Sequence, residues 1–279
     1  MNRLEYLQER INNNLFLSFE IVQERLFPGR KMKILFSPKQ HWQHLIEKGF
    51  QFTQHQLTFE DFSSKNINKH DLVVPLTIRD LQLLDGMRPL ISANPIPIPS
   101  RKSTILCNDK YLLSQALMAK SFATYVPTIG GRLAYPFILK KRVDVWGAHS
   151  HLISGKHQEE IFFDTLTHPD YFCQEFILGP HEYATHVLFK NQQIVCALNI
   201  KYIFNTETPI KGKDTPIFTH ICRCPFLGLF STILEAIKFE GLCCFNYKVI
   251  DNHPFIFEIN PRFGGSLAPY FFSFIRHIE

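Results

Sequence analysis

The residues best suited to chemistry lie in one stretch near the carboxyl end, Phe255 to Ser266 (FIFEINPRFGGS). Its apolar start predicts a buried strand, and alternation along that strand places Glu258 and Asn260 on one face. A carboxylate and an amide oxygen suit Mg²⁺, which is often shared with substrate phosphates. Arg262 adds a planar fork that suits phosphate or carboxylate. The stretch predicts a site for a cation and an anion together, although a strand ending in a polar turn at Gly264-Gly265 shares each single feature.

A second strand is expected next to this one. Leu242 to Val249 (LCCFNYKV) is apolar, and Asp251-Asn252-His253 predicts a turn that leads into Phe255 to Asn260. Antiparallel pairing across that turn brings Asn246 close to Glu258.

Two lysines upstream could bind an anion. Asn108-Asp109-Lys110 opens a helical stretch from Tyr111 to Phe122, and Tyr135 to Lys141 (YPFILKK) predicts a buried strand that ends in lysines. Lys140 can fix an anion while its stem packs on apolar neighbours; the alternative is that it faces solvent. The loop that follows, Arg142 to Ser150, contains one glycine, and either His149 or His151 could contact phosphate there.

The middle of the chain predicts a strand, a hinge and a hairpin. Tyr171 to Glu182 (YFCQEFILGPHE) is an apolar strand that ends at Gly179-Pro180. Tyr183 to Phe189 and Gln193 to Tyr202 then form an expected antiparallel pair, with Lys201 near its end.

These motifs, in this order, resemble the ATP-grasp superfamily, especially its branch of carbamoyl phosphate synthetase and amino-acid ligases. The resemblance covers about residues 103–270, with EINPRFGGS as its most specific part and the glycine-poor loop as a departure. It implies that Asn246, Glu258 and Asn260 hold Mg²⁺, or Mn²⁺, on ATP, and that Arg262 contacts the transferred phosphoryl group with help from Lys140. The residues that it assigns to ATP are Lys110, Lys140, Gln174, Glu175, Phe176, Ile177, Glu182 and Lys201. Phe176 and Ile177 could also be simply core residues, and both roles can hold, because adenine pockets are built from core residues.

The function implied is that of an ATP-dependent carboxylate-amine ligase that forms an amide bond through an acyl phosphate. The substrates would be a small carboxylic acid and an amine, such as an amino acid, a peptide or a sugar acid. Two alternatives stay open: carbamoyl- or carboxy-phosphate chemistry, and nucleotide binding without catalysis.

The elements that must position these residues predict an α/β (α+β) fold. Residues 1–27 have helical periodicity, and 28–91 alternate short strands (Met32–Ser37, Leu57–Phe59, Asp71–Leu76) with helices (His41–Lys48, Ile78–Leu84). Ser92 to Ser100 contains three prolines and predicts a domain boundary. We expect a small α/β domain over 1–102 and an ATP-grasp domain over 103–279, with subdomains at about 103–173 and 174–279. The segment 205–219 predicts a loop, 225–239 a helix, and the residues after Ser266 a short apolar tail.

Composition restricts the class further. With 45% hydrophobic and 20% charged residues, the 279-residue chain is expected to be a soluble protein with a sizeable core. No apolar run approaches the length of a membrane helix, and the polar amino end does not predict a signal peptide. Seven cysteines without metal spacing fit a cytoplasmic protein. The scattered charge, net +5, does not require nucleic acid, and a homodimer is left open.

Overall fold

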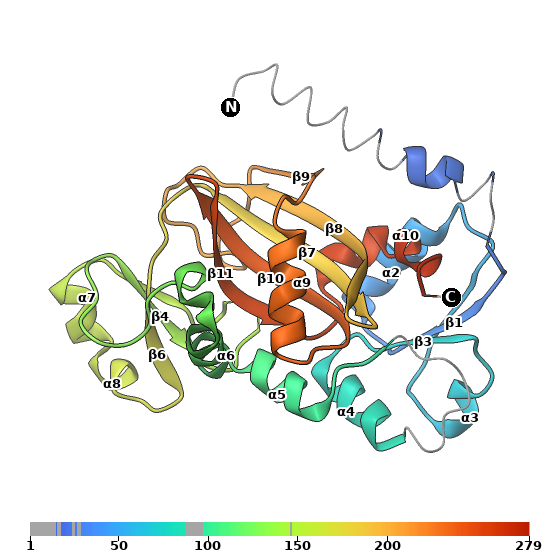
Figure 1. Cartoon of the computed structure of the whole chain (residues 1–279), viewed down its shortest axis with the longest axis horizontal. Coiled ribbons are helices and arrows are strands. Elements are labelled where there is room, and N and C mark those ends of the chain that lie inside the picture. The colour runs from blue at the N-terminus through green and yellow to red at the C-terminus, as the bar shows by residue number, and fades with distance from the viewer. Residues whose placement is uncertain are drawn as a thin grey trace.

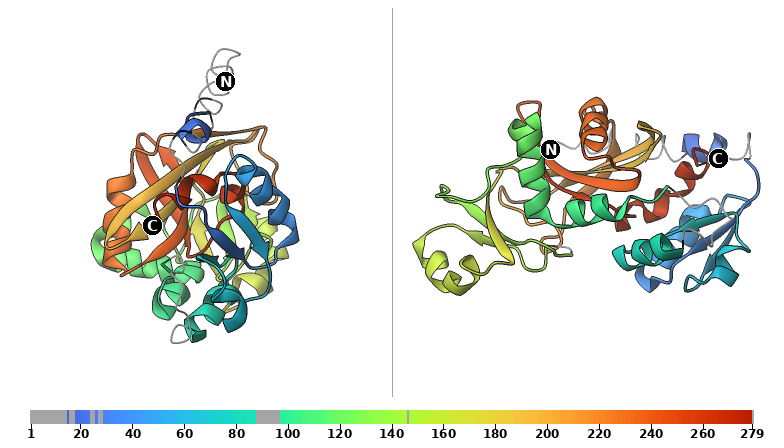
Figure 2. Two further views of the ribbon diagram at one scale, coloured as in Figure 1. Left: turned by 90° about the vertical axis from the view of Figure 1, so that its right-hand side faces the viewer. Right: turned by 60° about the horizontal axis from the view of Figure 1, so that its bottom comes forward.

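The computed structural model describes residues 15, 18–23, 26, 29–87, 97–145 and 147–278. Most of the helix expected over 1–27, the first half of the linker expected over 92–100, and Trp146 lie outside these ranges. The views in Figures 1 and 2 show three units in a row. A small sheet lies at one end, a large sheet in the middle and an α/β unit at the other end.

The first unit is a parallel sheet in the order β2-β1-β3. Strand β1 (Lys33–Phe36) pairs with β2 (Gln56–Phe59) and β3 (Leu72–Val74), both in parallel. Parallel neighbours need crossover connections, which contain α2 (Gln40–Phe50) and α3 (Ser64–Ile67); α4 (Ile78–Met87) follows β3. The small parallel α/β unit expected from the sequence is confirmed; α3 was not expected.

A helical connection leads to the middle unit: α5 (Arg101–Asn108), α6 (Lys110–Leu117), the π-helical turn η2 (Met118–Phe122) and the 3₁₀ turn η3 (Ala123–Tyr125). The sequence analysis predicted one helix here, from Tyr111 to Phe122, and so found α6 but not α5. The two helices are separated by Asp109. Its backbone is extended, and its carboxylate accepts hydrogen bonds from the amides of Tyr111 and Leu112, both at 3.0 Å. Asp109 therefore ends α5 and caps α6.

The small sheet has the order β5-β4-β6 and is antiparallel. It contains β4 (Phe137–Lys141), β5 (His151–Ile153) and β6 (Tyr171–Glu175), with the short helices α7 (Lys156–Ile161) and α8 (Phe163–Leu166). Strand β5 and both helices were not predicted. Strand β6 pairs with β4 over its whole length, so the expected subdomain boundary at 173/174 falls inside a strand.

The large sheet has five antiparallel strands in the order β11-β10-β7-β8-β9. They are β7 (His181–Lys190), β8 (Gln193–Ile203), β9 (Phe218–Cys222), β10 (Gly241–Ile250) and β11 (His253–Asn260), with α9 (Leu227–Ala236) after β9. The hairpin of β7 with β8 and the pair of β10 with β11 are confirmed. Strand β9 was missed, because its first residues fall in the predicted loop.

The two faces of the large sheet pack against different partners. Helices α6 and α9 cover one face, where Leu113 and Phe230 are buried with Phe245. The other face shares a core with the first unit, in which Phe36 and Trp42 are buried together with Leu188. The tail after Ser266 is not a simple extension, because its turn η4 (Gly265–Tyr270) and helix α10 (Phe272–Ile275) lie inside this shared core. Across the described residues, no helix combines the length and apolarity that crossing a membrane requires.

Candidate functional site

A cavity of about 470 Å³ lies where the three units meet. Its lining comes from α2, the start of α6, strands β4, β6, β7, β8, β10 and β11, and the segments that follow β4, β6, β8 and β11. Eleven of the twelve residues expected at the site line it: Lys110, Lys140, Gln174, Glu175, Phe176, Ile177, Glu182, Asn246, Glu258, Asn260 and Arg262. The exception is Lys201, whose strand neighbour Tyr202 faces the cavity in its place.

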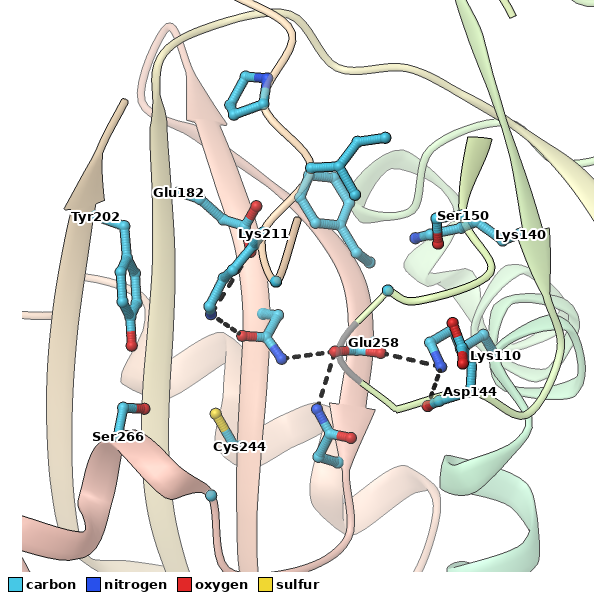
Figure 3. A pocket seen from close by; sticks show the side chains of 18 of the residues that line it. Lys110, Lys140, Asp144, Ser150, Glu182, Tyr202, Lys211, Cys244, Glu258 and Ser266 are labelled. Carbon is cyan, nitrogen blue, oxygen red and sulfur yellow. Dashed lines mark hydrogen bonds and ion pairs between the residues drawn. The ribbon is translucent and has the colours of Figure 1, made fainter. Parts of the chain in front are cut away.

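Glu258 is the centre of a polar network in this cavity (Figure 3). Its Oε1 accepts hydrogen bonds from the side-chain amides of Asn246 at 2.8 Å and Asn260 at 2.9 Å. Its Oε2 lies 3.3 Å from Nζ of Lys110. Burial alone would raise the pKa of Glu258, but the charges of Lys110 and Lys140 outweigh it and lower the pKa to about 2. The carboxylate is therefore ionised at neutral pH.

A β-bulge shapes this network. The register of β10 against β11 shifts between Asn246 and Tyr247: Asn246 is opposite Glu258, and Tyr247 is opposite Ile256. Phe257 is thus the additional residue on β11, and both Phe257 and Glu258 line the cavity although they are consecutive. Simple alternation would have turned Phe257 away.

Two lysines approach the network: Lys110 from the start of α6, and Lys140 from strand β4 of the small sheet. Lys110 donates from Nζ to the Asp144 carbonyl at 3.0 Å, and Lys140 donates to Gln174 Oε1 at 2.9 Å. Burial lowers the pKa of Lys140 to about 8, and the nearby charge of Lys110 acts in the same direction while Glu258 opposes it. The sequence alternative that Lys140 faces solvent is therefore wrong.

The glycine-poor loop after β4 is attached on both sides of the cavity. Arg142 forms hydrogen bonds from Nη2 at 2.8 Å and Nε at 3.0 Å to Asp109 Oδ2, and Lys213 donates to the Ser150 carbonyl at 2.6 Å. Gly147 lines the cavity with φ +61, a conformation that favours glycine. His149 pairs with Asp144, and His151 packs on Phe162; neither lines the cavity. The expected contact of these histidines with phosphate has no support.

The segment after β6 forms an apolar slot with one fixed cation. Phe176 and Ile177 line the cavity, and Lys248 donates from Nζ to the Ile177 carbonyl at 2.8 Å. The same ammonium lies 4.9 Å from the centre of the Phe176 ring. Glu175 uses its carboxylate to accept from the Thr128 amide at 3.1 Å. Aromatic and aliphatic walls beside polar backbone groups are typical of small-molecule sites.

Two lysines of the site were missed. Lys248 is only 2% exposed and lies two residues after Asn246 on β10, so alternation along that strand could have found it. Lys211 comes from the loop between β8 and β9, where no sequence pattern pointed to a site residue. Its Nζ donates to Asn246 Oδ1 at 2.6 Å and lies 3.5 Å from Glu182 Oε1. Burial lowers the pKa of Lys211, but Glu182 and other groups reverse the effect, so the pKa is raised.

The two glycines after Arg262, Gly264 and Gly265, leave space that the side chains of His186 and Trp42 occupy. A Cβ on Gly264 would lie 2.5 Å from the ring of His186, and one on Gly265 would lie 2.8 Å from the indole nitrogen of Trp42. This close packing holds the loop that carries Arg262, which lines the cavity and donates to the Phe263 carbonyl at 3.0 Å.

The donor set at Glu258 fits one hard cation. Within the described residues, no group of three or more His, Cys, Asp or Glu could hold a metal ion. Glu258 is instead flanked by two amides, each of which carries an oxygen as well as the nitrogen that now donates to it. The oxygen of Asn246 accepts from Lys211, so a cation there would displace that ammonium. Mg²⁺ accepts such mixed oxygen ligands and keeps positions for phosphate and water.

The fold and this arrangement of residues define a class of protein. A family profile for the ATP-grasp domain matches residues 107–266, which is more than half of the chain. The chain therefore belongs to the ATP-grasp family, as the sequence motifs indicated. No curated protein matches the sequence.

Several solved structures have the same fold. D-alanine–D-alanine ligase from Bacillus anthracis, complexed with ATP, is 11% identical with a TM-score of 0.54, and the match covers 84% of this chain and 87% of that one. N5-carboxyaminoimidazole synthetase from Staphylococcus aureus, complexed with ADP, is 15% identical with a TM-score of 0.54, covering 86% and 73%. L-amino acid ligase from Bacillus licheniformis is 12% identical with a TM-score of 0.57, covering 88% and 71%.

Proposed function

We propose that this protein is an ATP-dependent carboxylate-amine ligase. The observation that carries the proposal is the group formed by Glu258, Asn246 and Asn260, surrounded by Lys110, Lys140 and Lys211 in one cavity. The solved structures of this fold complexed with ATP and ADP support a nucleotide in this cavity. Two of the matched proteins are ligases.

The residues suggest a division of the cavity. The slot of Phe176 and Ile177 would hold the base, with Lys248 fixing the backbone beside it. Lys110 and Lys140 would bind the phosphates through charge-assisted hydrogen bonds. Asn246, Glu258 and Asn260 would hold Mg²⁺, which supplies charge neutralisation on the phosphates when it is bound. Lys211, which lines the cavity whereas Lys201 does not, would take the phosphate role that the sequence motifs had assigned to Lys201.

The reaction would proceed in two displacements. An oxygen of the acid attacks the γ-phosphorus of ATP, and the bond from that phosphorus to the β–γ bridging oxygen breaks. ADP departs as the leaving group, and the acid has become an acyl phosphate. An amine nitrogen then attacks the acyl carbon, the bond to the phosphate oxygen breaks, and the nitrogen gives its proton to solvent. Arg262 and Lys140 would stabilise charge on the phosphoryl group during transfer, so catalysis rests on positioning and electrostatics.

Phosphate release with ATP, Mg²⁺ and a panel of acids and amines tests this function. We expect release only when an acid is present, and an amide product when an amine is added. Lys140→Ala should weaken nucleotide binding by about 1.5–3 kcal/mol, the value of one charge-assisted contact. Exposed Lys31→Ala is the matched control and should bind like the wild type.

Other outcomes select the alternatives. Phosphate release with bicarbonate alone would indicate carboxy-phosphate chemistry. Tight ATP binding without release for any acid would leave nucleotide binding without catalysis. Small-molecule substrates, a cytoplasmic location and a homodimer remain predictions.

A further inference from the structure

One end of the cavity has no part in nucleotide binding as proposed. It is bounded by α2 and by the loop after β11, and its lining includes Trp42, Leu45, His186, Cys244 and Ser266. These residues are held together: Ser266 Oγ and His186 Nε2 are 2.8 Å apart, and Gly265 lies against the Trp42 ring. In Figure 3, Ser266 and Cys244 lie on the opposite side of Glu258 from Lys110 and Lys140.

This end is positive and contains no acid among the described residues. Arg262 lines it and donates to the Phe263 carbonyl. No carboxylate of the described residues lies at ion-pair distance from Arg262, although the more distant charge of Glu258 opposes the lowering of its pKa by burial. Lys39, half-buried, lies with Nζ 3.4 Å from the centre of the Trp42 ring. Its pKa is lowered to about 8 by burial and then by the charge of Arg262. Lys39 does not itself line the cavity, but its charge and that of Arg262 repel each other, so an anion bound at Arg262 would be favoured.

The acids of the cavity are elsewhere and already engaged. Asp144 pairs with His149, Glu175 with the Thr128 amide, Glu182 with Lys211, and Glu258 with Lys110. Asp80, which is near Lys39, accepts from Ser37 at 2.6 Å and from two backbone amides. His186 is fully buried and uncharged, because burial lowers its pKa to about 3.

We propose that this end of the cavity binds the acid substrate, and that this acid has an apolar body and no ammonium group. The carboxylate would lie at Arg262, and the body would pack on Trp42 and Leu45. An ammonium group here would be desolvated beside two cations without a carboxylate partner, which is strongly unfavourable. This inference rests on the proposed function and narrows the acid from amino acids, peptides and sugar acids to apolar monocarboxylates.

The test compares acids that differ only by an ammonium group. Calorimetry on the wild-type protein, saturated with Mg²⁺ and a non-hydrolysable ATP analogue, would measure 3-phenylpropionate against phenylalanine and 4-methylpentanoate against leucine. We expect the acid without the ammonium to bind at least 10-fold more tightly in both pairs. Equal or tighter binding of the amino acids, or no binding of any of the four, would overturn the inference.

A pair of variants adds a gain-of-binding test. Leu45 is only partly buried, so a polar side chain is tolerable there. Leu45→Glu supplies the missing carboxylate and should reduce the preference for 3-phenylpropionate over phenylalanine by about 10-fold. Leu45→Gln, whose side chain has the shape of Glu without its charge, should leave that preference unchanged. A preference that changes equally in both variants would argue against the proposal. If a variant fails to fold, the wild-type comparison still decides.

The same acids distinguish the inference from the function on which it rests. If 3-phenylpropionate binds as expected but releases no phosphate from ATP, the ligase function fails and the acid site stands. If phosphate is released with phenylalanine in preference to 3-phenylpropionate, the function stands and the inference fails.

Discussion

At the scale of single residues, charge decides what each group can do. Glu258 keeps its charge because lysines surround it, and it shares these lysines with any phosphate that enters. Lys140 shows the opposite balance: burial makes its charged form less stable, so its pKa is lowered to about 8. Bound phosphates would favour the charged ammonium again.

The pH dependence of nucleotide binding should reveal Lys140. Below about pH 8 the ammonium is charged and would bind phosphate; above that pH the free protein loses the charge, so affinity should fall as pH rises. Titrating an ATP analogue between pH 6 and 9.5 measures this. Lys140→Arg, charged throughout, should bind with a flatter profile. Lys248 and Lys39 titrate in the same range, since burial lowers the pKa of each to about 8, so an unchanged profile in Lys140→Arg would exclude Lys140 and leave Lys248 or Lys39 as the source of the effect.

At the scale of elements, the loop after β11 is fixed by close backbone contacts. Gly264 and Gly265 lie against His186 and Trp42 with no space for a Cβ. Because both rings are buried, they cannot move away without disturbing the core.

Gly264→Ala and Gly265→Ala should each destabilise the protein by about 1–3 kcal/mol, the usual cost of overpacking. Gly228→Ala is the matched control, because it lies in α9 with nothing within 4 Å of the new methyl group. Helix propensity predicts a gain of about 0.5–1 kcal/mol for that change. Urea denaturation measures all three; if Gly264→Ala were as stable as Gly228→Ala, the close contact with His186 would be disproved.

The elements that the sequence predicted correctly are those with a strong local pattern. Continuous apolar runs with turn residues between them identified β7, β8, β10 and β11, and the order of motifs picked out eleven residues that line the cavity. Strand β5 and helices α7 and α8 were missed because they are short and largely half-exposed or exposed. Lys211 was missed because its position depends on how a long loop folds back over β10, which no local pattern encodes. The bulge at Phe257 was missed for the same reason: only pairing reveals it.

At the scale of the whole molecule, the first unit and the large sheet share one core. Phe271, from the tail, contacts Phe36 and Phe50 of the first unit, with ring centroids 5.9 Å and 6.3 Å apart. It also contacts Phe263, beside Arg262, at 5.1 Å. The expected division at residue 102 therefore separates segments that depend on each other for burial.

Phe271→Ala should destabilise the protein by about 3–5 kcal/mol through the cavity that it leaves. The shared core predicts that the first unit and the large sheet unfold together. Urea denaturation followed by circular dichroism gives the free energy, and hydrogen exchange reports β1 and β7 separately. Protection of β7 that persists after β1 has exchanged would show that the two units are independent.

The loop from Asn260 to Ser266 has a thermodynamic consequence. It carries an expected metal ligand at one end and lies against Trp42 at the other, so the nucleotide and the acid would contact opposite ends of one short loop. Coupling between two ligands is reciprocal. By whatever factor Mg²⁺ and ATP change the affinity for the acid, the acid must change the affinity for the nucleotide by the same factor.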